Sequence, residues 1–322
     1  MNIDKGYVEA TIPEGIDLRA EIKRLKEEKN AVILAHYYTV GEIQELADFV
    51  GDSLALAQIA EKLDNDIIVM CGVHFMGETV KILCPEKKVL VPDLNAGCSL
   101  ADSCPAPELK KFIAAHPGHT VISYVNTSAA VKALTDIVVT SGNAMKVVGS
   151  MPPDAKIIFG PDRNLGNYIN SETGREMVLW DGACHVHEKF SLAGILDLKK
   201  KHPGAKVLVH PECPAAVRLV ADKVGSTAVL LKWAAEHEDA TEFIVATESG
   251  ILHEMRLKCP GKTFIPAPPD DAACACNECS FMKLNTLSKL YLTLLHELPE
   301  VTVDENIIDR ARRPIERMLE LS

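Results

Sequence analysis

Cysteine is the residue type whose number and context point most directly to chemistry in this sequence. The chain holds ten cysteines, and its first residues lack the charged-then-apolar layout of a signal peptide. We therefore expect a cytoplasmic protein, in which cysteines act as reduced thiols, metal ligands or catalytic groups rather than as a disulfide framework. A metal site is the leading expectation.

The segment CACNEC places Cys274, Cys276 and Cys279 in a C-x-C-x-x-C pattern. Such a cluster normally indicates a local zinc or redox site. A local zinc site needs a second close pair of ligands, and the sequence has no other cysteine pair at the usual knuckle spacing. Whether these cysteines form a local metal site or share a site with other cysteines depends on where the strands and helices place the remaining cysteines.

Short apolar runs rich in β-branched residues alternate with amphipathic stretches along the chain, which predicts parallel strands joined by helices and an α/β fold. The expected strands form three sets of four: 31–36, 48–51, 66–71 and 88–92; 120–125, 136–140, 156–160 and 176–180; 205–210, 221–225, 242–247 and 262–266. Helices are expected outside these sets at 17–29, 281–297 and 304–320.

The three sets keep step with one another, which indicates an internal repeat of about 88 residues. Four landmarks recur at strand ends: His36, Tyr124 and His210; Ser53, Ser141 and Ser226; Met76, Leu165 and Leu252; Cys98, Cys184 and Cys279. We infer three homologous three-layer αβα domains related by a pseudo-threefold axis, each with a four-stranded parallel sheet. The expected divisions are an N-terminal helical segment (1–30), domains at 31–104, 105–190 and 191–280, and C-terminal helices packing on the core (281–322).

Open α/β sheets bind their ligands at the carboxyl ends of the strands, so threefold packing would collect the landmarks in one central site. Cys98, Cys184 and Cys279 then meet at one point. Three thiolates suit a cubane iron–sulfur cluster whose fourth iron stays open as a Lewis acid. The alternative is that these are unrelated buried cysteines. Cys213, like Cys274 and Cys276, could belong to a redox pair or assist cluster loading.

Hydroxyl and carboxylate groups follow several strands and are expected to cap helices. Ser53, Ser141 and Ser226 lie in GDS, TSG and GST, where a hydroxyl at the helix N-cap leaves free N–H groups that favour anions. Three such pockets could converge on the centre. Asp162 follows Pro161 and is expected to cap a helix at a turn.

The first strand of each set ends in a side chain that can bind a carboxylate or move a proton, namely His36, Tyr124 and His210. Glu212, in HPEC, is the best general-base candidate. His187 lies three residues after Cys184 and is expected to contact the substrate or support a ligand.

Charge and hydropathy exclude two classes of partner. The net charge is −11, which argues against a nucleic-acid-binding surface. No apolar run approaches the roughly 18 residues that cross a bilayer, so no membrane span is expected.

Eight motifs follow one another along nearly the whole chain: AHYY, GDS, SYVNTSA, TSGNA, CHVHEKF, HPEC, GST and ATESGI. Because it has these motifs in this order, the sequence closely resembles the quinolinate synthase family. The resemblance implies three αβα domains around one 4Fe–4S cluster with three cysteine ligands and one open iron. It also implies a reaction: iminoaspartate (iminosuccinate) condenses with dihydroxyacetone phosphate, and phosphate and two waters leave, to give quinolinate for NAD synthesis. Transient contact with the enzyme that produces iminoaspartate would fit this role.

The resemblance assigns roles by motif. Cys98, Cys184 and Cys279 would bind the cluster, while Tyr38 and Glu212 would form the proton-transfer pair with His187 nearby. The implied substrate-binding residues are His36, Ser53, Tyr124, Asn126, Ser141, His210, Glu212, Ser226 and Thr227. The chain departs from many members at Ser280, where they have proline, and its C-x-C-x-x-C differs from the C-x-x-C-x-x-C of some members.

Two other interpretations stay open at this point. Another 4Fe–4S dehydratase acting on a small dicarboxylate would share the cysteine triad without forming a carbon–carbon bond. An iron–sulfur sensor or ligand-binding module belongs to a different class; the absence of a basic DNA-reading segment and the density of acid–base groups argue against it.

Overall fold

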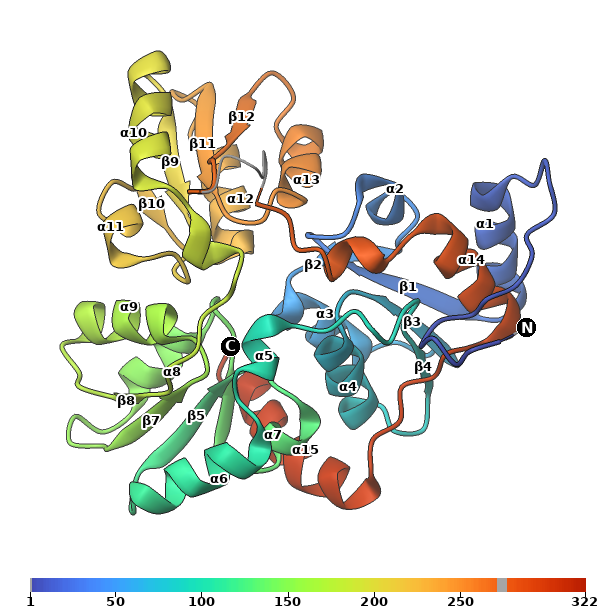
Figure 1. The fold of residues 1–322 in the computed structure, drawn as a ribbon, viewed down its shortest axis with the longest axis horizontal. Coiled ribbons are helices and arrows are strands. Elements are labelled where there is room, and N and C mark those ends of the chain that lie inside the picture. The colour runs from blue at the N-terminus through green and yellow to red at the C-terminus, as the bar shows by residue number, and fades with distance from the viewer. Residues whose placement is uncertain (1, 271–276) are drawn as a thin grey trace.

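The computed structural model describes residues 2–270 and 277–322 (Figure 1). It contains three four-stranded parallel sheets, and in each the strands lie in the order second, first, third, fourth. Helices lie between successive strands. The expected α/β fold with three sets of four strands is therefore confirmed. We call the three repeats unit 1, unit 2 and unit 3 in chain order, and Figure 1 shows them arranged around a common centre.

The elements of each unit follow the same plan. Unit 1 contains β1 (Ala31–His36), α2 (Gly41–Gln44), β2 (Phe49–Gly51), α3 (Ser53–Ala60), β3 (Ile67–Cys71), α4 (His74–Leu83), β4 (Lys88–Leu90) and α5 (Ser99–Asp102). Unit 2 contains α6 (Ala106–Ala115), β5 (Thr120–Tyr124), α7 (Ala129–Lys132), β6 (Ile137–Val139), α8 (Ala144–Ser150), β7 (Ile157–Gly160), α9 (Arg163–Thr173), β8 (Val178–Leu179) and the 3₁₀ turn η1 (His187–Lys189). Unit 3 contains α10 (Leu192–Lys201), β9 (Lys206–Val209), α11 (Ala215–Arg218), β10 (Lys223–Val224), α12 (Thr227–Glu236), β11 (Glu242–Ala246), α13 (Ile251–Lys258) and β12 (Thr263–Pro266).

The central strands are largely apolar because helices cover both faces of each sheet. Every residue of β1 and β3 is buried. Parallel strands buried on both faces need continuous apolar runs, which is the pattern that the sequence shows. The parallel register sets the carboxyl ends of neighbouring strands at one edge of each sheet, as in the pairing of Ala35 with Val50 and with Cys71.

In the part of the chain that the structure describes, three α-helices lie outside the units: α1 (Leu18–Glu28), α14 (Leu287–His296) and α15 (Glu305–Glu320). Helix α14 packs against α1, while α15 packs against α4 of unit 1 and against α7 and β6 of unit 2. The expectation of one continuous helix over 281–297 is wrong. A short turn, η2 (Met282–Leu284), ends at Asn285, whose backbone is extended, and the Thr286 side chain then caps α14.

No helix among the described residues has both the length and the apolar character needed to cross a membrane.

Candidate functional site

One cavity lies where the carboxyl ends of the three sheets meet, and all three units contribute to its wall. The side chains that line it include nearly all those expected from the sequence: His36, Tyr38, Ser53, Cys98, Tyr124, Asn126, Ser141, Cys184, His187, His210, Glu212, Thr227 and Cys279. The landmarks Met76, Leu165 and Leu252 do not line the cavity, contrary to expectation, and neither does Ser226. It is buried beside the wall and its hydroxyl caps α12. The repeat thus brings together residues that are far apart in the sequence.

The expected hydroxyl caps are present in only one unit of the three. Ser226 is an N-cap, but Ser53 is the first residue of α3, and the Asp52 carboxylate caps that helix by accepting from Ala55. Ser141 precedes α8, whose N-cap is Asn143. The expectation for Ser53 and Ser141 is therefore wrong. The Asp52 carboxylate caps α3 instead of Ser53, and Asn143 occupies the N-cap of α8 without a capping hydrogen bond from its side chain.

His36 and His210 occupy equivalent positions and share one hydrogen-bonding pattern. Nδ1 of His36 accepts the backbone N–H of Tyr38 at 3.1 Å, and Nδ1 of His210 accepts that of Glu212 at 3.4 Å. Burial lowers the pKa of each imidazole to about 3, and the charge of Lys283 contributes to the lowering for His36. Both rings are therefore neutral, with the proton on Nε2. Nε2 of His210 lies 3.2 Å from the Ser141 hydroxyl oxygen, whereas that of His36 can donate a hydrogen bond to an anionic ligand.

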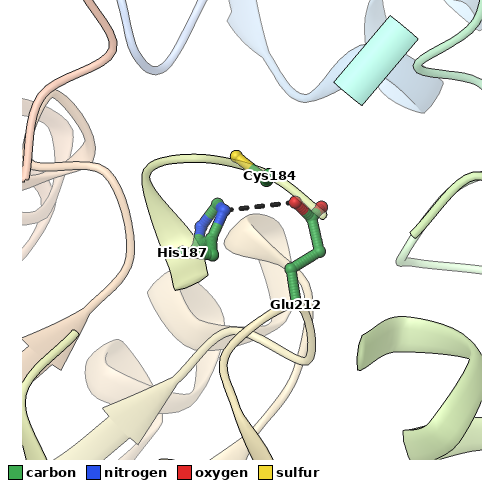
Figure 2. Close-up of side chains that lie close together, drawn as sticks. All are labelled: Cys184, His187 and Glu212. Atoms are coloured by element: carbon green, nitrogen blue, oxygen red, sulfur yellow. Dashed lines mark ion pairs between the residues drawn. The ribbon is translucent and has the colours of Figure 1, made fainter. Parts of the chain in front are cut away.

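Glu212 lines the cavity and is buried. The Tyr124 hydroxyl donates to its Oε1 at 2.5 Å, and Nδ1 of His187 lies 3.1 Å from its Oε2 (Figure 2). Nδ1 of His187 makes no hydrogen bond in this geometry, so its contact with Glu212 is a close approach of the two side chains. Burial alone would raise the pKa of Glu212, but His187, His210 and the Tyr124 hydroxyl outweigh it and lower the pKa to about 2. Glu212 is therefore ionised and available as a base.

Hydroxyl groups extend this cluster to Tyr38. The Tyr38 hydroxyl lies 2.9 Å from Oγ1 of Thr227 and 2.8 Å from Oγ1 of Thr247, and Nε2 of His187 lies 3.0 Å from the same Thr247 oxygen. A continuous polar chain thus joins Tyr38 to Glu212 through Thr247 and His187. Burial raises the pKa of Tyr38 well above its ordinary value, so its phenol keeps its proton. Thr247 was not predicted, although its place just after a third strand of the repeat marks it as facing the centre.

The three thiols of Cys98, Cys184 and Cys279 line the cavity, one from each repeat. Burial raises the pKa of each, that of Cys98 to about 12, and neighbouring thiols add to the effect for Cys98 and Cys184. Three desolvated sulfurs that resist separate ionisation fit a site completed by a metal group that compensates their charge. The sulfur of Cys184 also lies within 4.8 Å of donor atoms of His187 and Glu212 (Figure 2).

The other cysteines of the described residues are buried and do not line the cavity: Cys71, Cys84, Cys104, Cys213 and Cys259. Cys274 and Cys276 lie outside the described residues.

A backbone hydrogen bond that recurs in all three units holds each cysteine loop against its sheet. In every case, the third residue after the third strand donates its N–H to the carbonyl that lies two residues before the cysteine. The bonds run from His74 to Ala96 (2.6 Å), from Arg163 to Gly182 (2.8 Å) and from Ser249 to Asn277 (3.4 Å). The cysteine triad therefore occupies equivalent positions in structure as well as in sequence.

Comparisons with known proteins agree with this architecture. The sequence model of the family described as quinolinate synthetase A protein matches residues 20–320. The quinolinate synthase of Trichormus variabilis is 56% identical over 316 residues, covering 98% of this chain and 97% of the relative. That of Thermosynechococcus vestitus is 56% identical over 310 residues (96% and 97%), and that of Chloroherpeton thalassium is 55% identical over 307 (95% and 95%).

The family match and the relatives both extend over nearly the full length, and the residues that carry the motifs face one cavity. The chain belongs to the quinolinate synthase family.

Proposed function

We propose that this protein makes quinolinate by condensing iminoaspartate with dihydroxyacetone phosphate, with loss of phosphate and two waters, in NAD biosynthesis. The observation that carries the proposal is the single cavity in which three thiols from three repeats face the acid–base cluster around Glu212. Family membership supports the same reaction, and it does not favour the alternative of another dicarboxylate dehydratase. A cytoplasmic location and transient contact with the enzyme that supplies iminoaspartate complete the proposal.

The cofactor of the proposal is one 4Fe–4S cluster held by Cys98, Cys184 and Cys279. When bound, the cluster supplies one open iron, a Lewis acid that can polarise a substrate oxygen and assist its elimination. The chemistry of the donor set supports this choice, since thiolates are the ligands that iron–sulfur clusters prefer.

The remaining residues bind and orient the substrates. Both substrates are anions, and the Nε2–H groups of His36 and His210 are neutral donors at the ends of two first strands. The hydroxyls of Ser53 and Ser141 and the amide of Asn126 add donors from units 1 and 2. Neutral donors from several directions hold carboxylate and phosphate in a dry site without fixing a competing charge there.

Proton transfer falls to Glu212 and Tyr38. The ionised Glu212 removes protons from substrate carbon and nitrogen atoms, and the Tyr124 hydroxyl steadies the carboxylate while it does so. Tyr38 keeps its proton at the other end of the polar chain and can donate it to a departing oxygen. His187 and Thr247, which lie between them, can return a proton to Tyr38 after each transfer.

The test is iron and sulfide analysis of protein purified without oxygen, followed by an assay for quinolinate with both substrates present and with each omitted. We expect about four irons per chain, lost in Cys98→Ala, Cys184→Ala and Cys279→Ala alike, and product only when both substrates are supplied. Zinc in place of iron, iron retention in any of these variants, or turnover of a dicarboxylate alone would reject the proposal.

A further inference from the structure

Two fully buried carboxylates occupy equivalent positions in units 2 and 3. Asp162 lies two residues after the end of β7 and Glu248 two residues after the end of β11, and each side chain is 0% exposed. The equivalent residue of unit 1, two residues after β3, is Val73. Each of these residues immediately precedes the backbone donor of the recurring hydrogen bond to the cysteine loop, so the structural equivalence does not depend on the sequence spacing alone.

Asp162 connects the start of a helix to a cysteine. Its Oδ1 accepts the backbone N–H of Leu165 at 2.7 Å and so caps α9, as expected from the sequence. Its Oδ2 accepts the backbone N–H of Cys184 at 3.2 Å. One rigid side chain therefore ties the Cys184 loop to the end of the sheet.

Glu248 makes the corresponding connection in unit 3. Its Oε1 accepts the backbone N–H of Cys279 at 3.0 Å, and its Oε2 accepts that of Gly250 at 2.7 Å. Nζ of Lys283 lies 2.8 Å from Oε1 and also donates to the carbonyl of Tyr38 at 2.8 Å. Glu248 thereby links a cysteine of unit 3 to the backbone of unit 1.

A buried carboxylate is costly unless its oxygens are satisfied, and in both residues each oxygen accepts a backbone N–H. Side chains that hydrogen-bond to metal-ligating residues commonly fix the geometry of those ligands. In unit 1 the equivalent residue, Val73, has no side-chain acceptor to offer the N–H of Cys98.

We propose that Asp162 and Glu248 are positioning residues that hold Cys184 and Cys279, respectively, in place for the iron–sulfur cluster. The inference rests on the proposed function, because it takes these cysteines as cluster ligands. Each carboxylate acts on the cysteine of its own unit, so the two effects are separable.

The first test uses cluster-free protein and measures the alkylation rate of each cysteine by mass spectrometry. Asp162→Ser keeps a cap for α9 but is too short to reach Cys184, and Glu248→Gln keeps the size of the side chain while losing one of its two acceptors. We expect Asp162→Ser to accelerate alkylation of Cys184 several-fold without changing Cys279, and Glu248→Gln to do the reverse. Cys98 should react at the wild-type rate in both.

The second test measures iron release from cluster-loaded protein to a ferrous chelator. Loss of residues that support metal ligands typically weakens metal binding 10–100-fold, so both variants should release iron faster by about this factor. The matched control is Asp93→Asn. Asp93 is also buried, pairs with Lys289 at 2.5 Å and accepts the N–H of Asn95, but does not contact a triad cysteine. The Asp93→Asn variant should release iron at the wild-type rate.

Three results would overturn the inference: equal acceleration of all three cysteines, no acceleration, or iron release in Asp93→Asn as fast as in the two test variants. Each can occur while the wild type binds iron and makes quinolinate, which leaves the proposed function standing. A wild type that takes up no iron instead rejects the proposed function, and with it the purpose assigned to the two carboxylates.

Discussion

Tyr124 and Glu212 meet across the boundary between units 2 and 3, where the phenol donates a hydrogen bond to the carboxylate at 2.5 Å. Tyr124 ends β5, and Glu212 follows the end of β9 by three residues. The repeat thus places a donor from one unit on a base from the next. Because the base and its hydrogen-bond donor come from different units, the proposed chemistry depends on how units 2 and 3 are placed relative to each other.

Replacing Glu212 with Gln should abolish the proposed base while preserving the cavity, because the two side chains have nearly the same shape. We expect kcat to fall by about 10²–10⁴, the usual contribution of a general base, with iron content unchanged. Quinolinate formation and iron analysis on the same preparation measure both. Glu254→Gln is the control, since Glu254 is buried in α13 and does not line the cavity. Full turnover in a cluster-loaded Glu212→Gln protein would remove Glu212 from this role.

Tyr124→Phe should shift the pH dependence of turnover. The Tyr124 hydroxyl is one of the groups that lower the pKa of Glu212, so its loss raises that pKa. A base that protonates at higher pH loses activity at higher pH, and the acid limb of the kcat profile should therefore move upward. Tyr37→Phe is the control, because Tyr37 is buried but does not line the cavity. An unmoved acid limb in Tyr124→Phe would show that Glu212 does not depend on this hydroxyl.

His36 should make the cluster-free protein sensitive to mild acid. Its pKa is about 3 in the folded chain and near 6.5 when unfolded, so between these values the unfolded state binds more protons. Stability is therefore lost as the pH falls from 6.5 towards 3. Between pH 7 and pH 5, His36 should account for about 2 kcal/mol of the loss. His36→Asn keeps an acceptor for the Tyr38 N–H and should lose correspondingly less in denaturant titrations at the two pH values. Equal losses would mean that His36 is protonated in the fold.

The arrangement of the sheets was predictable because buried parallel strands leave a strong local signal. Apolar runs like those of β1 and β3 recur in each repeat, and so do the side chains at the strand ends. This recurrence was sufficient to predict that Cys98, Cys184 and Cys279 face one site, and all three line the same cavity. The composition of a strand records its burial directly.

Features that depend on a competition between neighbours were harder to predict. Asp52 caps α3 in place of Ser53, and Thr286 begins a new helix within the stretch expected to be continuous. Asp162 and Glu248 accept hydrogen bonds from backbone N–H groups of residues distant in the sequence. The sequence alone does not indicate which backbone N–H groups need a side-chain acceptor. Such contacts appear only once the chain is folded.

Thr247 should contribute to catalysis only by connecting the Tyr38 phenol to the His187 ring. Its hydroxyl contacts both the Tyr38 phenol and the His187 ring, and valine has nearly the same shape without the hydroxyl. Thr247→Val should therefore lower kcat by about tenfold or more, a modest share of an acid–base contribution, while KM and iron content stay near wild type. Thr79→Val is the matched control, because the buried Thr79 hydroxyl donates to the Phe75 carbonyl within its own helix. If Thr247→Val raises KM at unchanged kcat, Thr247 binds substrate and the polar chain between Tyr38 and Glu212 does not carry protons.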